Sequence, residues 1–119
     1  MSAGMPQEIW LNKFGVIVEQ VFGHTPYHVG SSLKGKVWRD VDVRLILPDD
    51  EYDAMFGRAR LNYVDPKFAG LTLAFATLAK EMTGLPVDFQ IQRQSYANKI
   101  YGDEPRNPLM EFTPETETP

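Results

Sequence analysis

The sequence predicts an α/β (α+β) domain in which helices cover a small, mixed β-sheet. Two segments, residues 41–47 (VDVRLIL) and 87–92 (VDFQIQ), alternate apolar and polar side chains, as half-buried strands do. Between them, residues 66–83 follow an Asp-Pro pair and end at a glycine, which is typical of a helix with an N-cap and a left-handed C-cap. The expected order of helix, strand, strand, helix, strand favours helices packed against one face of the sheet.

The N-terminal elements lead to a glycine turn. Residues 6–22 combine Pro6 in a first turn with apolar side chains at helical spacing, and we expect Trp10 on the buried face of this helix. Residues 27–29 predict a short strand, and Gly30 follows it as the first residue of the turn.

Two short helices and a tail complete the prediction. Residues 49–60 place acids first and bases last, which suits the dipole of a short helix. Residues 94–102 are compatible with a second one. We predict that residues 1–100 form a single domain and that residues 101–119, rich in Pro, Glu and Thr, form a flexible tail.

Composition excludes several classes of function. The chain of 119 residues is long enough for one domain with a real core, and it has no cysteine for a disulfide or a thiolate metal site. Its net charge of −4 argues against extended, non-specific nucleic-acid binding. No apolar run is long enough to cross a bilayer, so we expect no membrane partner and a cytoplasmic location.

Carboxylates gather on the polar faces of the two long strands. Alternation places Asp40 and Asp42 on one face of the first strand and Asp88 on the polar face of the second. If the two polar faces lie together, three carboxylates meet on a surface where strands are about 4.8 Å apart. Such a cluster repels itself unless it holds a cation, and oxygen ligands suit Mg²⁺ or Mn²⁺.

Other polar residues surround this cluster. Gly30, Ser31 and Ser32 form a turn whose N–H groups and hydroxyls are suited to bind a phosphate. Two basic side chains, Lys36 and Arg44, could neutralise phosphate charge. Two glutamines, Gln90 and Gln92, could contact a base or an acceptor.

A P-loop is the competing interpretation of the same turn. Residues 30–36 match the spacing G-x-x-x-x-G-K, but the next residue, Val37, lacks the hydroxyl with which a P-loop binds Mg²⁺. A predicted strand follows instead of a helix, and we therefore set this interpretation aside.

Three motifs resemble the nucleotidyltransferase superfamily that includes DNA polymerase beta, in particular its minimal, single-domain members. They are Val29-Gly30-Ser31, then Asp40-Val41-Asp42-Val43, and later Val87-Asp88-Phe89. The chain differs from many members of this family in carrying Leu33-Lys34 after the Gly-Ser pair and Arg39 before the first acid.

The resemblance implies a nucleotidyltransferase-like fold and an Mg²⁺-dependent reaction. Asp40 and Asp42 would hold two metal ions that bridge a nucleoside triphosphate such as ATP, and Asp88 would complete the site and help to activate an acceptor hydroxyl. Attack on the α-phosphorus would release pyrophosphate, and paired metals stabilise both the attacking and the leaving oxygen of such a displacement. Ser31 would contact the terminal phosphates.

Two other classes of function remain open. The acceptor implied by the resemblance is a small molecule, a protein or an RNA end, and the sequence does not choose among them. The alternatives to an enzyme are a non-catalytic module that binds a partner protein, and a regulator that binds NTP without turnover, for example an antitoxin-like protein.

Overall fold

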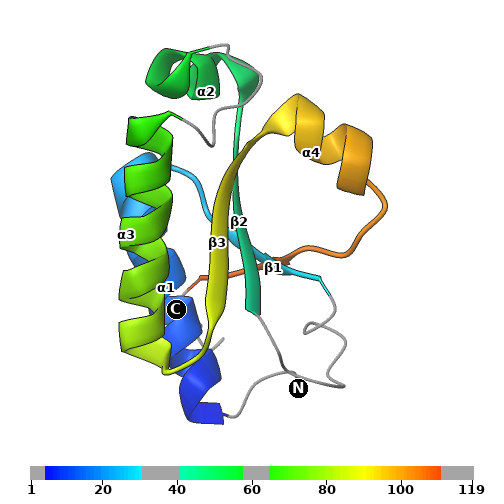
Figure 1. Ribbon diagram of the computed structural model, residues 1–119. Helices are drawn as coiled ribbons and strands as arrows, with labels where there is room; N and C mark the ends of the chain where they lie inside the picture. The colour runs from blue at the N-terminus through cyan, green and yellow to red at the C-terminus, as the bar shows by residue number, and fades with distance from the viewer. Residues whose placement is uncertain (1–4, 31–40, 58–64, 111–119) are drawn as a thin grey trace, which may run out of the picture.

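The computed structural model describes residues 5–30, 41–57 and 65–110. These residues fold around a four-stranded mixed sheet. The strands lie in the order β3-β2-β1-β4, as Figure 1 shows. Their bounds are Tyr27–Val29 for β1, Val41–Leu47 for β2, Val87–Arg93 for β3 and Asn107–Pro108 for β4. β2 and β3 are parallel, whereas β1 is antiparallel to both β2 and β4. The predicted α+β class with a mixed sheet is confirmed.

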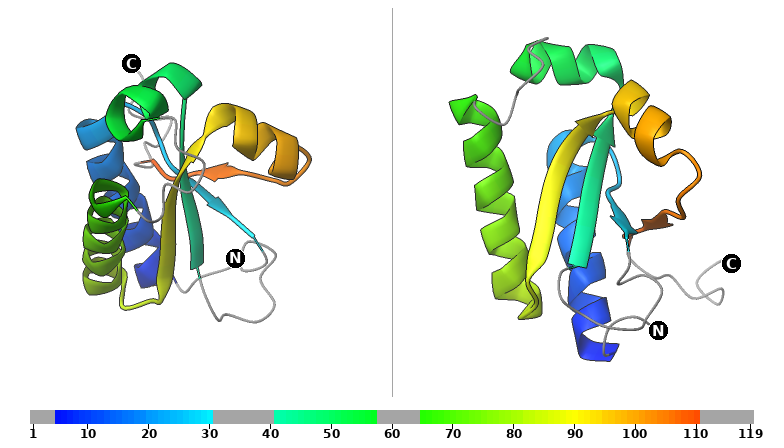
Figure 2. Two further views of the ribbon diagram at one scale, coloured as in Figure 1. Left: turned by 45° about the horizontal axis from the view of Figure 1, so that its top comes forward. Right: turned by 45° about the vertical axis from the view of Figure 1, so that its right-hand side comes forward.

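Two long helices cover one face of the sheet, and a short helix lies over the other. α1 (Met5–Phe22) and α3 (Pro66–Thr83) pack side by side on the first face. α2 (Asp49–Phe56) follows β2 at the end of the sheet, and α4 (Gln94–Tyr101) lies on the opposite side from α1 and α3, as the two views of Figure 2 show. The two long predicted helices therefore cover one face as expected, and α4, which was not part of that expectation, lies on the other.

The ends of the central elements agree with the local signals in the sequence. The Asp65 side chain accepts a hydrogen bond from the Lys67 N–H at 3.3 Å and caps the start of α3. Gly84 ends this helix in the left-handed conformation with φ 74°. α2 is shorter than expected because Gly57, with φ 81°, ends it after Phe56.

Strand alternation separates an apolar face from a polar one. Val41, Val43 and Leu45 are fully buried, and the aromatic rings of α1, α3 and β3 pack beneath them. The Phe14 ring meets the Phe89 ring edge-on at a centroid distance of 5.7 Å. The polar residues of β2 and β3 consequently face the side that α4 covers.

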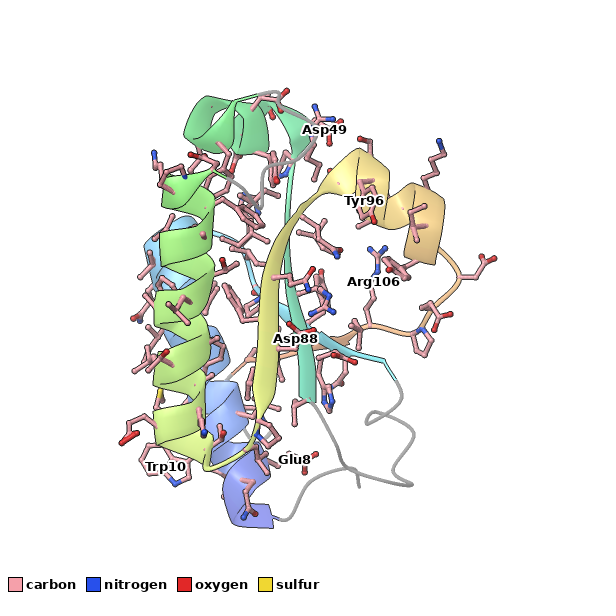
Figure 3. All side chains as sticks on the ribbon, in the orientation of Figure 1. Glu8, Trp10, Asp49, Asp88, Tyr96 and Arg106 are labelled. Carbon is pink, nitrogen blue, oxygen red and sulfur yellow. The ribbon has the colours of Figure 1, made fainter. Side chains whose placement is uncertain are left out.

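Trp10 is not in this core, and the expectation that it is buried is wrong. Trp10 is 46% exposed, and Figure 3 shows its side chain on the outside of the helical layer. The buried face of α1 is formed by Leu11, Phe14 and Val18, from which Trp10 is rotated around the helix axis. The Lys13 ammonium lies 6.0 Å from the centroid of the Trp10 ring instead.

The predicted domain boundary at residue 100 also differs from the structure. α4 runs to Tyr101, and the chain then returns to pair β4 with β1. Leu109 is 2% exposed, and its N–H donates to the Pro26 carbonyl at 2.9 Å. Residues 101–110 are thus part of the fold, while 111–119 lie outside the described residues.

Close contact between α1 and the β4 region depends on a glycine in the middle of the helix. A Cβ at Gly15 would overlap the Cβ and the carbonyl group of Leu109. A glycine within a helix lowers stability by about 1 kcal/mol relative to alanine. Its presence at position 15 indicates that the close approach of Leu109 to α1 stabilises the fold by at least as much.

Among the helices of the described segments, none combines the length and the apolar character that a membrane span requires.

Gly15→Ala should destabilise the protein by about 1–3 kcal/mol, because the added methyl group overpacks against Leu109. Urea denaturation measures the change. The matched control is Gly70→Ala in α3, where a Cβ would meet nothing within 4 Å among the described residues, and which should stabilise by up to about 1 kcal/mol. Equal stabilisation by both substitutions would show that Leu109 does not pack against α1.

Candidate functional site

The parallel pairing of β2 and β3 brings two acidic side chains together. Asp42 lies directly beside Asp88, and the next polar-face pairs along the strands are Arg44 with Gln90 and Ile46 with Gln92. Paired residues of adjacent strands point to the same face, about 4.8 Å apart. We call Asp42 and Asp88 the carboxylate pair. Figure 3 shows Asp88 on the polar side of β3.

Arg44 lies between the two carboxylates. Its Nη2 is 3.3 Å from Asp88 Oδ2 and 3.8 Å from Asp42 Oδ1. Its Nη1 donates to two backbone carbonyls, that of Asp88 at 2.8 Å and that of Val43 at 3.1 Å. The guanidinium is therefore fixed by the sheet itself and neutralises part of the charge of the carboxylate pair.

This arrangement gives Arg44 a different environment from the one its sequence position suggested. The sequence placed Arg44 among possible phosphate ligands, but its guanidinium contacts acidic side chains. A phosphate bound at Arg44 would compete with the carboxylate pair for the same N–H groups.

Gly30 lies against the Asp42 carboxylate. It follows β1, in which Val29 is paired with Asp42, and it has a φ of 86°, which side-chain-bearing residues rarely adopt. A Cβ at Gly30 would overlap Asp42 Oδ2. Both the conformation and the close approach require glycine here. The other predicted site residues, Ser31, Ser32, Lys36 and Asp40, lie outside the described residues.

A cavity of about 310 Å³ adjoins Asp42, and its volume is within the size range of small-molecule sites. We call it the site cavity. One wall is the polar face of the sheet, and the other is formed by α4 and the segment that leads to β4. Its lining residues are Val29, Gly30, Asp42, Arg44, Ile46, Gln92, Ala97, Tyr101, Glu104 and Arg106. Asp88 is not among its lining residues and lines a separate hollow with residues of α3.

Three of the lining residues lie in a part of the chain where the sequence predicted no site. Tyr101, Glu104 and Arg106 belong to the segment predicted to be a flexible tail. The Arg106 side chain reaches α4, where Nη2 donates to the Ala97 carbonyl at 3.3 Å and to Asn98 Oδ1 at 3.2 Å (Figure 3). No local pattern marks these residues, because their position depends on the return of the chain as β4.

The two predicted glutamines have different environments. Gln90 is exposed, and its Nε2 donates to Asp88 Oδ1 at 3.4 Å. Gln92 is only 9% exposed and lines the site cavity. Of these two glutamines, Gln92 alone is therefore placed to contact a molecule inside the site cavity.

An ion-pair and capping network joins α4 to the end of β2. Arg93 donates to both Asp53 oxygens, Nε to Oδ1 at 3.1 Å and Nη2 to Oδ2 at 2.9 Å. Asp49 Oδ1 accepts the Ser95 N–H at 3.0 Å, in the first turn of α4. The hydrogen bonds from Ser95, first that of its backbone N–H, lower the pKa of Asp49, and the bond with Asp53 raises the pKa of Arg93. This network holds the helical wall of the site cavity.

Neither histidine contributes to the cavity. His28 is 2% exposed and is paired with Val43, whose side chain lies in the core. Burial lowers the pKa of His28, so its imidazole is neutral at pH 7. His24 Nε2 lies 2.7 Å from Glu51 Oε1 on the surface.

The described residues include part of the predicted metal site. Asp42 and Asp88 are two of the three predicted carboxylate ligands and have hard oxygens of the kind that Mg²⁺ prefers. Within the described ranges, no group of three or more His, Cys, Asp or Glu is placed to hold a metal ion. The third predicted ligand, Asp40, lies outside those ranges.

Comparison of the chain with protein-family models found no match, and neither did comparisons with curated proteins and with solved structures. The residues of the site are therefore the basis for assigning a function.

The Asp49–Ser95 cap predicts a pH-dependent stability. Because the pKa of Asp49 is lowered by folding, the stabilisation is present above its ordinary pKa of about 3.8 and is lost as pH falls through the lower, folded value. The melting temperature of Asp49→Asn should be below that of the wild type at neutral pH, with a difference that shrinks in acid. Thermal melts across this pH range measure it. A constant difference would show that the Asp49 charge is not involved.

Proposed function

We propose that this chain is an Mg²⁺- or Mn²⁺-dependent nucleotidyltransferase of the DNA polymerase beta-like superfamily. It would move a nucleoside monophosphate from an NTP such as ATP to an acceptor hydroxyl and release pyrophosphate. The observation that carries the proposal is the carboxylate pair on adjacent parallel strands, with the Gly30 backbone against Asp42 and the site cavity beside it.

Each residue has a role in the proposed site. Asp42, Asp88 and Asp40 would hold the metal ions, which stabilise the attacking and leaving oxygens when bound. Gly30 permits its backbone to lie close to Asp42. Ser31 and Ser32, which follow it in the sequence, would bind the phosphates. Lys36 would add positive charge there.

Arg44 would act as a positioning residue for the carboxylate pair. Its bonds to the Asp88 and Val43 carbonyls do not depend on the carboxylates, so the guanidinium can stay in place when a metal binds. A carboxylate has two oxygens with several lone pairs, and the Arg44 contacts use one oxygen of each aspartate.

The acceptor is a small molecule, a protein or an RNA end. The net charge of −4 disfavours a long nucleic-acid footprint. We place the activity in the cytoplasm, since its proposed substrate is an NTP.

A metal-dependent nucleotide site should be visible as a thermal shift. With Mg²⁺, at least one of the four NTPs should stabilise the wild type by about 2.7 kcal/mol at a hundredfold excess over Kd. Asp42→Asn and Asp88→Asn should each remove the shift while leaving the protein folded. The matched control is Glu81→Gln, which removes a carboxylate from the exposed side of α3, and should keep the full shift.

Transfer is then tested with labelled NTP and a lysate. Label that appears in a macromolecule or small product, with pyrophosphate released, supports the transferase. Nucleotide binding without transfer supports the regulator. A folded protein that no NTP stabilises, with or without metal, contradicts both.

A non-catalytic interaction module is the second candidate, and the Arg44 contacts favour it. A guanidinium that already neutralises part of the charge of the carboxylate pair makes a bound metal less necessary for folding.

Arg44→Met discriminates between the two candidates. Removing the guanidinium takes away the positive charge that Arg44 places between Asp42 and Asp88, and should destabilise the metal-free protein by about 1–3 kcal/mol. If the carboxylate pair is a metal site, millimolar Mg²⁺ or Mn²⁺ should restore much of this loss, because a divalent ion replaces the missing charge. If the protein is an interaction module, denaturation curves of the variant with and without metal should coincide.

A further inference from the structure

The Arg106 guanidinium lies in the wall of the site cavity without an opposite charge beside it. Its Nη2 donates to the Ala97 carbonyl at 3.3 Å and to Asn98 Oδ1 at 3.2 Å, and both acceptors are uncharged. Among the described residues, no ion pair includes Arg106, although Glu104 lines the same cavity. Arg106 is therefore a half-buried cation whose charge the described part of the chain leaves unpaired.

This guanidinium has unused hydrogen-bond donors. Arginine carries five N–H groups in one plane, and the two bonds of Nη2 use two of them. No further hydrogen bond from the Arg106 side chain is present in the described ranges. Because Nη2 is anchored to α4, the N–H groups of Nε and Nη1 have a set orientation. Such a planar group binds the oxygens of a carboxylate or a phosphate through charge-assisted hydrogen bonds.

A buried amide on the opposite wall supplies a second set of donors. Gln92 is 9% exposed and lines the site cavity, and no hydrogen bond to its side chain is present in the described segments. A buried amide without a partner is costly, and such groups are rare in native proteins. Gln92 belongs to β3, whereas Arg106 belongs to the wall that faces the sheet. The amide NH₂ and the guanidinium are thus donors on two walls of one cavity.

The acidic residues that line the cavity do not supply the missing partner. Asp42 lies beside Arg44, with 3.8 Å between Oδ1 and Nη2. It is also four residues along β2 from the position that pairs with Gln92, a separation of about 13 Å along the sheet. Glu104 is exposed, so water and salt screen its charge. An anionic group beside Gln92 and Arg106 consequently gains the attraction of an unpaired cation.

We propose that Arg106 and Gln92 bind an oxyanion group, a carboxylate or a phosphate, of a small molecule in the site cavity. Nε and Nη1 of the guanidinium and the amide NH₂ donate to its oxygens. The cavity volume of about 310 Å³ is within the size range of small-molecule sites.

The proposed function, on which this step rests, identifies that molecule as the acceptor. In the transferase, the phosphates of the NTP lie at the Gly30 end of the cavity, beside the metal ions. The oxyanion at Arg106 is then a separate group. The acceptor is a small molecule that carries both the hydroxyl and a carboxylate or phosphate.

The test titrates the full, metal-free chain with phosphate and, separately, with acetate, at an ionic strength kept constant with chloride. In two-dimensional NMR spectra, the Arg106 Nε–H and Gln92 NH₂ signals are identified by their absence in Arg106→Lys and Gln92→Met. Both sets of signals should shift in a saturable way with at least one of the two anions. The anion that binds more tightly identifies the group as a phosphate or a carboxylate.

Substitutions separate the two donors. Arg106→Met should weaken binding of the preferred anion at least about tenfold, because charge-assisted hydrogen bonds are lost. Arg106→Lys keeps the charge without the planar group and should restore only part of the affinity. Gln92→Met should weaken binding about three- to tenfold. It leaves the bonds between Arg106 and α4 intact, so it tests the site even where Arg106→Met does not fold.

The matched control is Lys99→Met. It removes the same charge from an exposed position of α4 that is not among the cavity-lining residues, and its affinity for the anion should equal that of the wild type. Three results would overturn the inference. They are the absence of a saturable shift of the Arg106 and Gln92 signals with either anion, unchanged affinity in Gln92→Met and Arg106→Met, and an equal loss of affinity in Lys99→Met.

Failure of this inference is distinguishable from failure of the transferase. Absence of anion binding at Arg106, together with an intact NTP shift that depends on Asp42, removes the acceptor site alone. Anion binding at Arg106 in a folded protein that no NTP stabilises keeps the oxyanion site and removes the proposed transferase.

Discussion

The site depends on the position of the Arg44 guanidinium, which two backbone carbonyls of adjacent strands hold in place. Parallel pairing of β2 and β3 puts Asp42 beside Asp88, and two neighbouring carboxylates repel each other unless positive charge lies close by. Arg44 supplies that charge from the same face. The opposite face of the same strands is apolar and buried under α1 and α3, so the strand register that builds the core also builds the carboxylate pair.

Much of this arrangement could be predicted from the sequence because its signals are local. The alternation of apolar and polar side chains defined β2 to the residue, and Asp65, Pro66 and Gly84 defined the ends of α3. The same alternation already places Arg44 on the face of Asp42. Its assignment to phosphate came from its distance along the chain to Gly30, which was a weaker guide than the face it occupies.

Features that depend on distant contacts could not be predicted. β4 contains Asn107 and Pro108, which have low strand propensity, and it exists because the Leu109 region fits against α1 where Gly15 has no side chain. The position of Trp10 was misjudged because apolar spacing identifies a helix but does not say which apolar residues the sheet covers. The wall of the site cavity formed by Tyr101, Glu104 and Arg106 follows from the return of the chain, which no local pattern encodes.

Charged side chains of both signs limit what the site cavity can bind. Asp42 and Arg44 lie at the end near Gly30, and Glu104 and Arg106 line the wall that faces the sheet. An ionic group that leaves water for this cavity can therefore gain an opposite charge, and a purely apolar ligand would leave these groups without one. The cavity thus favours polar or charged molecules. The Arg106 guanidinium donates to the Ala97 carbonyl of α4, and α4 is held in turn by Asp49 and Asp53, so the network that fixes this helix also fixes the charged wall of the cavity.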